Sequence, residues 1–357
     1  YSHPKQELSI EAQEQLLVYA QEATNPILII GALESKADQC AALQLAKTLD
    51  WPVFIDISSG IALQNIQNKI PFVDVILEQN HVIPTPDLIL QLGRGFTTKR
   101  YEHWTRTLNV PHIIIDSRSS RHDPGHSCTW RLQADISSLL FLEQLQCPNL
   151  SWIRKLQIQL QRISIPMQEV SKISIAYQLP SWLPNNSQLF IGNSMPIRDC
   201  NNYSLPAEKI VLACNRGVSG IDGIISTAAG WAIGGQKHSF LLIGDISFMH
   251  DIGVLFSLQA INVSLTIVLI NNSGGGIFSF LPVSKEEDIF ETHFATKHSF
   301  ELAPVVQAMG IKVQSLESMT ELKAALEQPI QGLSFLEIRT DREQNYREHQ
   351  DIKQCII

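Results

Sequence analysis

The sequence predicts an α/β protein built from two doubly wound domains, each with a parallel sheet. Short apolar runs of strand length alternate with helical patterns, and this alternation occurs in two successive blocks. Alternation of this kind produces a parallel sheet that is covered by helices on both faces. The length of 357 residues also suggests two domains rather than one. We expect the first domain to span residues 1–150 and the second to span residues 165–357.

In the first block, each expected strand is a short apolar run between more polar segments. The expected strands cover residues 26–31, 51–56, 88–93 and 112–116, and the expected helices cover residues 11–22 and 35–49. Further helical material lies between the later strands. The first strand ends at a single glycine, Gly31, without the G-x-G-x-x-G pattern of dinucleotide-binding domains. The sequence therefore argues against a nicotinamide dehydrogenase.

The second block begins after a helix that is expected over residues 151–162. The strands that follow are expected at residues 188–191, 210–213, 239–243, 264–270 and 333–338. The helices between them are expected at residues 226–232, 251–259, 303–309 and 319–326. In an open parallel sheet, ligands bind in the crevice outside the carboxyl ends of the strands. The residues that follow these strands are therefore the first candidates for a functional site.

The composition argues against two kinds of partner. Hydrophobic residues make up 44% of the chain and charged residues 17%, which is ordinary for a globular protein. No stretch approaches the roughly 18 consecutive apolar residues of a membrane-spanning helix. The net charge is −8 and the Lys and Arg residues are scattered, so no basic stripe indicates nucleic acid. We expect small-molecule ligands, no nucleic acid and no membrane span.

The most specific pattern is Gly244-Asp245, followed after 25 residues by Asn271-Asn272. Asp245 and Asn272 each follow an expected strand, and an intervening helix would make the two loops neighbours. Either dipeptide alone would be an ordinary turn. Mg²⁺ prefers hard oxygen ligands and takes others from phosphate groups. Asp245, Asn272 and a main-chain carbonyl of the adjoining glycine turn fit such a site.

This pattern resembles the signature of the thiamine-diphosphate enzyme superfamily. The resemblance implies that Asp245, Asn272 and the carbonyl of Gly274 hold Mg²⁺ or Mn²⁺, which bridges the two phosphates of thiamine diphosphate. Backbone amides of residues 244–247 would complete the anion site. Ile246 stands where many members of the superfamily have a third glycine. The implied cofactor-binding residues are Ser194, Gly220, Ile221, Gly244, Asp245, Ile246, Ser247, Asn272, Gly274, Gly275 and Ile277.

Four further strings resemble the 2-succinyl-5-enolpyruvyl-6-hydroxy-3-cyclohexene-1-carboxylate synthase family, in the same order and with approximately the same spacing. They are residues 98–100 (TKR), 192–198 (GNSMPIR), 215–223 (NRGVSGIDG) and 271–282 (NNSGGGIFSFLP). The resemblance extends over nearly the whole chain, and a residue other than glycine at position 246 is compatible with it. It implies that the protein decarboxylates 2-oxoglutarate and adds the succinyl carbanion equivalent to isochorismate, in menaquinone or phylloquinone biosynthesis.

Both implied substrates are dicarboxylates, and Arg binds carboxylates in a two-pronged geometry. Arg198 and Arg216 each follow a strand end, and we expect them to face the crevice as catalytic and substrate-binding residues; the alternative is a surface ion pair. Lys99 and Arg100 also end a strand, and we expect them to reach the site across the domain interface. By resemblance, Ile221 is a third catalytic residue that props the cofactor in a bent shape. Further substrate contacts are expected from Ser194, Ile277 and Phe278.

The resemblance also implies that a part of the enzyme is missing from this segment. Members of the superfamily take the glutamate that drives tautomerisation of the cofactor's pyrimidine from a separate pyrimidine-binding domain. Nothing before Glu11 could be that domain. We therefore expect these residues alone to be inactive. The complete enzyme is expected to be a homodimer or homotetramer in the bacterial cytoplasm or the plastid stroma.

Two alternative functions stay open at this point. An acetolactate synthase-like enzyme or a 2-oxo-acid decarboxylase would share the metal site but would not need the set of cationic residues. A noncatalytic remnant or subunit would share the fold. The intact metal-ligand pattern argues against a remnant, because a decayed site would lose its ligands first.

Overall fold

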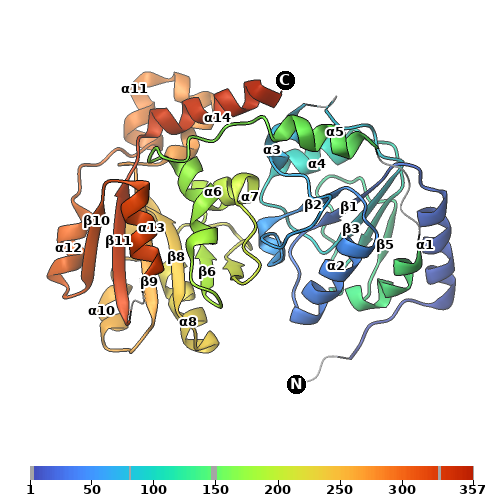
Figure 1. Ribbon diagram of the computed structural model, residues 1–357, viewed down its shortest axis with the longest axis horizontal. Coiled ribbons are helices and arrows are strands. Elements are labelled where there is room, and N and C mark those ends of the chain that lie inside the picture. Colours follow the sequence, from blue (N-terminus) through green and yellow to red (C-terminus); the bar gives the residue numbers. More distant parts are fainter. Residues whose placement is uncertain (1–3, 80–81, 146–150, 329–330, 357) are drawn as a thin grey trace. The chain divides into compact units, whose positions relative to one another are not determined.

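The computed structural model describes residues 4–79, 82–145, 151–328 and 331–356 (Figure 1). Contacts within the chain divide it into two units, residues 1–163 with 355–357 and residues 164–354. Each unit contains one sheet whose paired strands all run parallel, with helices packed against it. The predicted class of two doubly wound α/β domains is confirmed.

The first unit contains a five-stranded sheet with the order β2-β1-β3-β4-β5. Every residue of its three central strands is buried, which explains their continuous Ile and Leu runs. The strands are β1 (Pro26–Ile30), β2 (Val53–Ile55), β3 (Leu88–Leu92), β4 (His112–Ile115) and β5 (Trp130–Leu132). The helices are α1 (Ile10–Glu22), α2 (Lys36–Thr48), α3 (Val73–Glu78), α4 (Lys99–Arg106) and α5 (Ser151–Leu160), with 3-10 segments at Ile57–Ser59 and Ile136–Gln144.

The second unit contains a six-stranded sheet with the order β10-β11-β9-β8-β6-β7. The strands are β6 (Gln188–Ile191), β7 (Val211–Cys214), β8 (Ser239–Gly244), β9 (Leu265–Asn271), β10 (Lys312–Leu316) and β11 (Leu333–Arg339). The α-helices are α6 (Lys172–Trp182), α7 (Met195–Tyr203), α8 (Ile224–Gly235), α9 (Asp245–Asp251), α10 (Val254–Gln259), α11 (Glu287–Ile289), α12 (Leu302–Ala308), α13 (Met319–Glu327) and α14 (Arg342–Ile356). Shorter helical segments cover Gly276–Phe280, Pro282–Lys285 and Phe290–Phe294.

The core of the second unit lies between the sheet and the helices α8, α9, α10 and α12. Alternate residues of β8 and β9, among them Leu241, Ile243 and Ile267, point into this core together with Phe335 of β11. Phe248 of α9 packs on Phe335 with ring centroids 5.1 Å apart. Burying such side chains contributes roughly 1.5–3 kcal/mol each. This packing holds β8 and β9 rigidly, and so it holds the loops that leave their carboxyl ends.

Several elements differ from what the sequence predicts. The single helix expected over residues 251–259 is instead two helices, α9 and α10, and α9 begins directly at the end of β8. The sequence pattern also misses β5 and β10, because β5 has only three residues and the edge strand β10 is largely polar and exposed. The pattern also misses α7, where Arg, Asp and Asn interrupt the apolar residues although most of the helix is buried, and α14, which is mostly polar. Within the described ranges, no helix combines the length and apolar character needed to cross a membrane.

Candidate functional site

Asp245 lies at the centre of a hydrogen-bond network beyond the carboxyl end of β8. It is the first residue of α9, and only 1% of it is exposed. Its Oδ2 accepts hydrogen bonds from the backbone N–H of Asn272 (3.2 Å) and of Gly274 (2.9 Å), while Oδ1 accepts from the N–H of Ile246 (2.8 Å). The structure therefore brings Asp245 and the Asn272 loop together, as the strand pattern predicts.

Four adjacent strands contribute candidate residues to the same edge of the sheet. In the order β9-β8-β6-β7, the chain leaves these strands toward Asn272, Asp245, Ser194 and Arg216. The chain runs from β6 to β7 on one side and returns to β8 on the other side of β6. The connections thus diverge between β6 and β8, which is the place where open parallel sheets bind ligands.

The glycine turn beside Asp245 has a backbone that only glycine adopts easily. Gly274 has φ +153°, and a Cβ added to it would lie 2.7 Å from the carbonyl oxygen of Ala295. The next amide, that of Gly275, donates to the same carbonyl at 2.6 Å. Ser273 before them has φ +56°. The close approach of residue 295 fixes the turn in place over Asp245.

His298 completes the surroundings of Asp245. Its Nε2 lies 3.2 Å from Asp245 Oδ2, and its Nδ1 accepts the N–H of Phe300 at 3.3 Å. Because Nδ1 accepts and the carboxylate can only accept, Nε2 is the donor to Asp245. The imidazole orients the carboxylate in the way that outer partners orient metal ligands. Sequence reasoning missed His298, which follows an irregular segment without a periodic pattern.

The oxygen groups at this point fit a hard divalent cation. Asp245 Oδ1 accepts one hydrogen bond and keeps acceptor capacity, since an ionised carboxylate accepts about four. In the described part of the chain, the buried Nδ2 of Asn272 has no hydrogen-bond partner, and turning this amide would present its oxygen instead. No group of three His, Cys, Asp or Glu side chains that could hold a metal occurs among the described residues. Phosphate oxygens and a carbonyl would be needed to complete an octahedron.

The loops after β6 and β7 are joined through Asn193, a further residue that sequence reasoning missed. Asn193 is 1% exposed; its Nδ2 donates to the carbonyl of Gly220 (2.6 Å), and its Oδ1 accepts from Arg216 Nη1 (2.9 Å). The following residue, Ser194, has φ +71° and ψ −130° at the start of α7. Backbone strain of this kind persists where the surroundings enforce it, and it gathers at functional sites.

The remaining predicted residues of this unit lie on the same loops. Ile221, next to Gly220, is half-buried just before α8. Ile277 and Phe278 lie in the 3-10 helix Gly276–Phe280. The Phe278 ring meets Phe294 at 5.9 Å in a T-shaped contact, and it covers Gly275. Gly244 and Ser247 flank Asp245 at the start of α9, where the N–H of Ile246 already donates to the Asp245 carboxylate.

Three predicted cationic residues lie elsewhere than expected. Lys99 and Arg100 do not end a strand: β3 stops at Leu92, and both residues open α4 behind the capping side chain of Thr98. Lys99 is exposed, and Arg100 forms an ion pair with Glu78 of α3. Arg198 lies within α7, seven residues beyond β6, rather than at a strand end. The positive φ of Gly93 (+71°) turns the chain before the Lys-Arg pair is reached.

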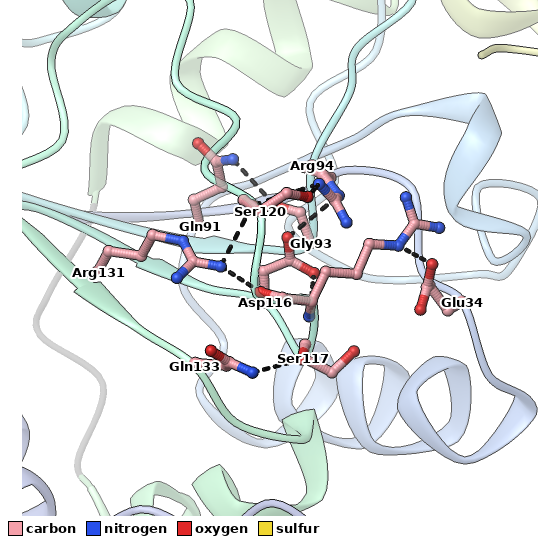
Figure 2. Close-up of polar contacts among 10 residues, drawn as sticks. Glu34, Gln91, Gly93, Arg94, Asp116, Ser117, Ser120, Arg131 and Gln133 are labelled. Carbon is pink, nitrogen blue, oxygen red and sulfur yellow. Dashed lines mark hydrogen bonds and ion pairs between the residues drawn. The ribbon is translucent and has the colours of Figure 1, made fainter. Parts of the chain in front are cut away.

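A separate polar network closes the carboxyl edge of the first sheet (Figure 2). Arg94 follows β3 and pairs with Asp116, which follows β4, at 3.1 Å between Nε and Oδ2. Arg94 Nη1 also donates to Ser120 Oγ at 2.7 Å. Arg118 pairs with Glu34, and Arg131 donates to the carbonyls of residues 118 and 120. These arginines hold the loop after β4 against its neighbours.

Comparison with known proteins agrees with this geometry. The family model "Middle domain of thiamine pyrophosphate" matches residues 1–191, and "Thiamine pyrophosphate enzyme, C-terminal TPP binding domain" matches residues 210–338. The chain is 35% identical over 348 residues to a 2-succinyl-5-enolpyruvyl-6-hydroxy-3-cyclohexene-1-carboxylate synthase of Prosthecochloris aestuarii, with 94% of this chain and 59% of the relative covered.

Proteins of two further organisms are also similar to this chain. A synthase with the same description from Listeria innocua is 30% identical over 343 residues, with 91% of this chain and 59% of the relative covered. The protein PHYLLO, chloroplastic, of Arabidopsis thaliana is 32% identical over 372 residues, with 91% and 22% covered. The chain thus spans about three fifths of the length of the bacterial relatives. It belongs to the thiamine pyrophosphate enzyme family, and it carries that family's middle domain and C-terminal cofactor-binding domain.

Proposed function

We propose that the complete protein is a transferase that decarboxylates 2-oxoglutarate and transfers the remaining four-carbon unit to isochorismate. The product would be 2-succinyl-5-enolpyruvyl-6-hydroxy-3-cyclohexene-1-carboxylate, in menaquinone or phylloquinone biosynthesis. The observation that carries the proposal is the buried Asp245 held against the Asn272–Gly274 loop, in a chain similar to synthases of that description. The proposal concerns the complete protein, because the relatives extend well beyond the matched segment.

In this proposal, Asp245, Asn272 and the carbonyl of Gly274 would hold Mg²⁺ or Mn²⁺, which would help to bind the diphosphate of thiamine diphosphate. When bound, the cofactor supplies the electron sink for decarboxylation. The glycine turn and the start of α9 would bind the phosphates, and His298 would keep the Asp245 carboxylate oriented. The other cofactor contacts would come from Ser194, Gly220, Ile221, Gly244, Ile246, Ser247, Gly275 and Ile277.

The proposed substrate contacts follow from the charge of the substrates. Two dicarboxylates need cations to balance them, and Arg216 lies at the edge of the sheet where Asn193 fixes one nitrogen of its guanidinium group. Arg198, Ser194, Ile277 and Phe278 belong to the same proposal, as do Lys99 and Arg100 of the first domain. A homodimer or homotetramer is proposed as the assembly. A bacterial cytoplasm or a plastid stroma is proposed as the compartment.

The test uses the complete protein with thiamine diphosphate and Mg²⁺. We expect release of CO₂ from 2-oxoglutarate to exceed that from pyruvate, and expect the Asp245→Asn variant, which loses a proposed metal ligand, to lose most of this activity. Asp288→Asn, which changes an exposed carboxylate on α11, serves as the matched control and should keep wild-type turnover. Faster turnover of pyruvate would favour an acetolactate synthase-like enzyme or a 2-oxo-acid decarboxylase. No turnover of either substrate would indicate a noncatalytic protein.

A further inference from the structure

A buried lysine, Lys172, lies beside the proposed diphosphate site. It is the first residue of α6, directly after the capping Ser171, and is 5% exposed. A Cβ added to Gly276 would lie 2.7 Å from Lys172 Nζ and 3.1 Å from Asn272 Nδ2. The ammonium group therefore rests against the same glycine turn whose other end covers Asp245.

Two buried carboxylates act electrostatically on this ammonium group. Burial lowers the pKa of Lys172, the charges of Asp199 and Asp245 raise it, and that of Arg342 lowers it. Asp199, on α7, is 1% exposed; its Oδ1 pairs with His349 Nε2 at 3.0 Å, and its Oδ2 has no hydrogen-bond partner within the described ranges. Arg342 is itself paired with Glu291. Lys172 is thus a buried cation whose charge interacts with both carboxylates.

Considered by itself, the buried position of Lys172 lowers the stability of the fold. A buried ammonium group loses its hydration, and a cation at a helix N-terminus opposes the helix dipole. Local conflicts of this kind are expected where a site requires them. The requirement here is one of charge, since a divalent cation and a diphosphate carry opposite signs and would bind at the same turn.

We propose that Lys172 is a positioning residue that makes this site select the metal–diphosphate complex over the bare metal ion. The proposal rests on the function proposed for Asp245. The fixed positive charge repels a divalent cation that enters alone. It attracts the complex, because the negative charge of the diphosphate exceeds the positive charge of the metal. Removing the charge should therefore change the two affinities in opposite directions, whereas loss of a merely structural residue would weaken both.

The experiment measures Mn²⁺ binding to the complete protein by electron paramagnetic resonance, with and without thiamine diphosphate. Lys172→Met keeps the length of the side chain and removes its charge. We expect Mn²⁺ alone to bind about tenfold more tightly and Mn²⁺ with thiamine diphosphate about tenfold more weakly than in the wild type. Lys172→Arg keeps the charge and should keep both affinities near their wild-type values. Lys323→Met, an exposed lysine of α13, should change neither affinity.

The outcomes separate this inference from the proposed function. Weakening of both affinities in Lys172→Met, or no change in either, overturns the role of Lys172 alone. Mn²⁺ binding in the wild type that Asp245→Asn does not reduce overturns both proposals. Should Lys172→Met fail to fold by circular dichroism, the uncharged Lys172→Gln replaces it under the same criteria.

Discussion

Both sheets are parallel, and charged residues lie in the loops at the carboxyl ends of their strands. The charges are arranged in opposite ways at the two edges. At the edge of the first sheet, arginines and carboxylates neutralise one another: Arg94 pairs with Asp116, and Arg118 pairs with Glu34 (Figure 2). At the edge of the second sheet, Asp245 has no arginine or lysine within ion-pair distance in the described part of the chain and is held by backbone N–H groups and His298. The parallel-sheet architecture that the two domains share therefore does not determine their function. What determines it is whether the loops at the edge leave hydrogen-bond acceptors unoccupied.

The largest effect is expected at the first edge, on stability rather than on binding. Arg94→Met removes one partner of a largely buried ion pair and leaves Asp116 unpaired, which should lower the free energy of unfolding by about 3–5 kcal/mol. Urea titration gives this value. Mn²⁺ affinity should stay at the wild-type value, and a change beyond about twofold, a free-energy difference of about 0.4 kcal/mol, would show that the two edges are coupled.

A smaller effect concerns the acid stability of the first domain. Burial lowers the pKa of His112 from 6.5 to about 4, and its ring is held between Ser127 Oγ and Gln91 Oε1, each at 3.0 Å. Because the folded-state pKa lies below the unfolded value, the stabilisation is complete above about pH 6.5 and is lost as the pH falls toward 4. The loss should reach about 3 kcal/mol. Urea titrations at several pH values should show a shallower dependence in His112→Gln; an identical dependence would refute the assignment.

The smallest effect tests the glycine turn of the second edge. Gly274→Ala forces a Cβ to within 2.7 Å of the Ala295 carbonyl at a φ of +153°, and we expect a loss of about 2 kcal/mol. Gly253→Ala is the matched control, because its φ is −60° and an added Cβ meets no atom within 4 Å. Equal melting temperatures for the two variants would show that the turn is not constrained.

The sequence predicts the site residues of the second sheet well where these residues lie close to the end of a strand. Asp245 and Asn272 each lie within two residues of an apolar run, so parallel pairing alone brings them together. His298 and Lys172 escape prediction because their roles come from tertiary contact: His298 follows an irregular segment, and Lys172 has the sequence pattern of a surface lysine behind a helix cap. The sequence pattern places Lys99 and Arg100 wrongly at the end of a strand. The string at residues 98–100 does not by itself reveal the turn at Gly93 that precedes it.

The backbone of Ser194 has a consequence for anyone who would stabilise this protein. A non-glycine residue at φ +71° and ψ −130° carries a conformational cost of about 1–3 kcal/mol that glycine would largely relieve. Selection for heat resistance alone would therefore drive position 194 toward glycine and discard a hydroxyl group at the point where the connections of the sheet diverge. Thermal screening and catalytic screening would then choose different residues at the same position, as they do where activity depends on a strained conformation.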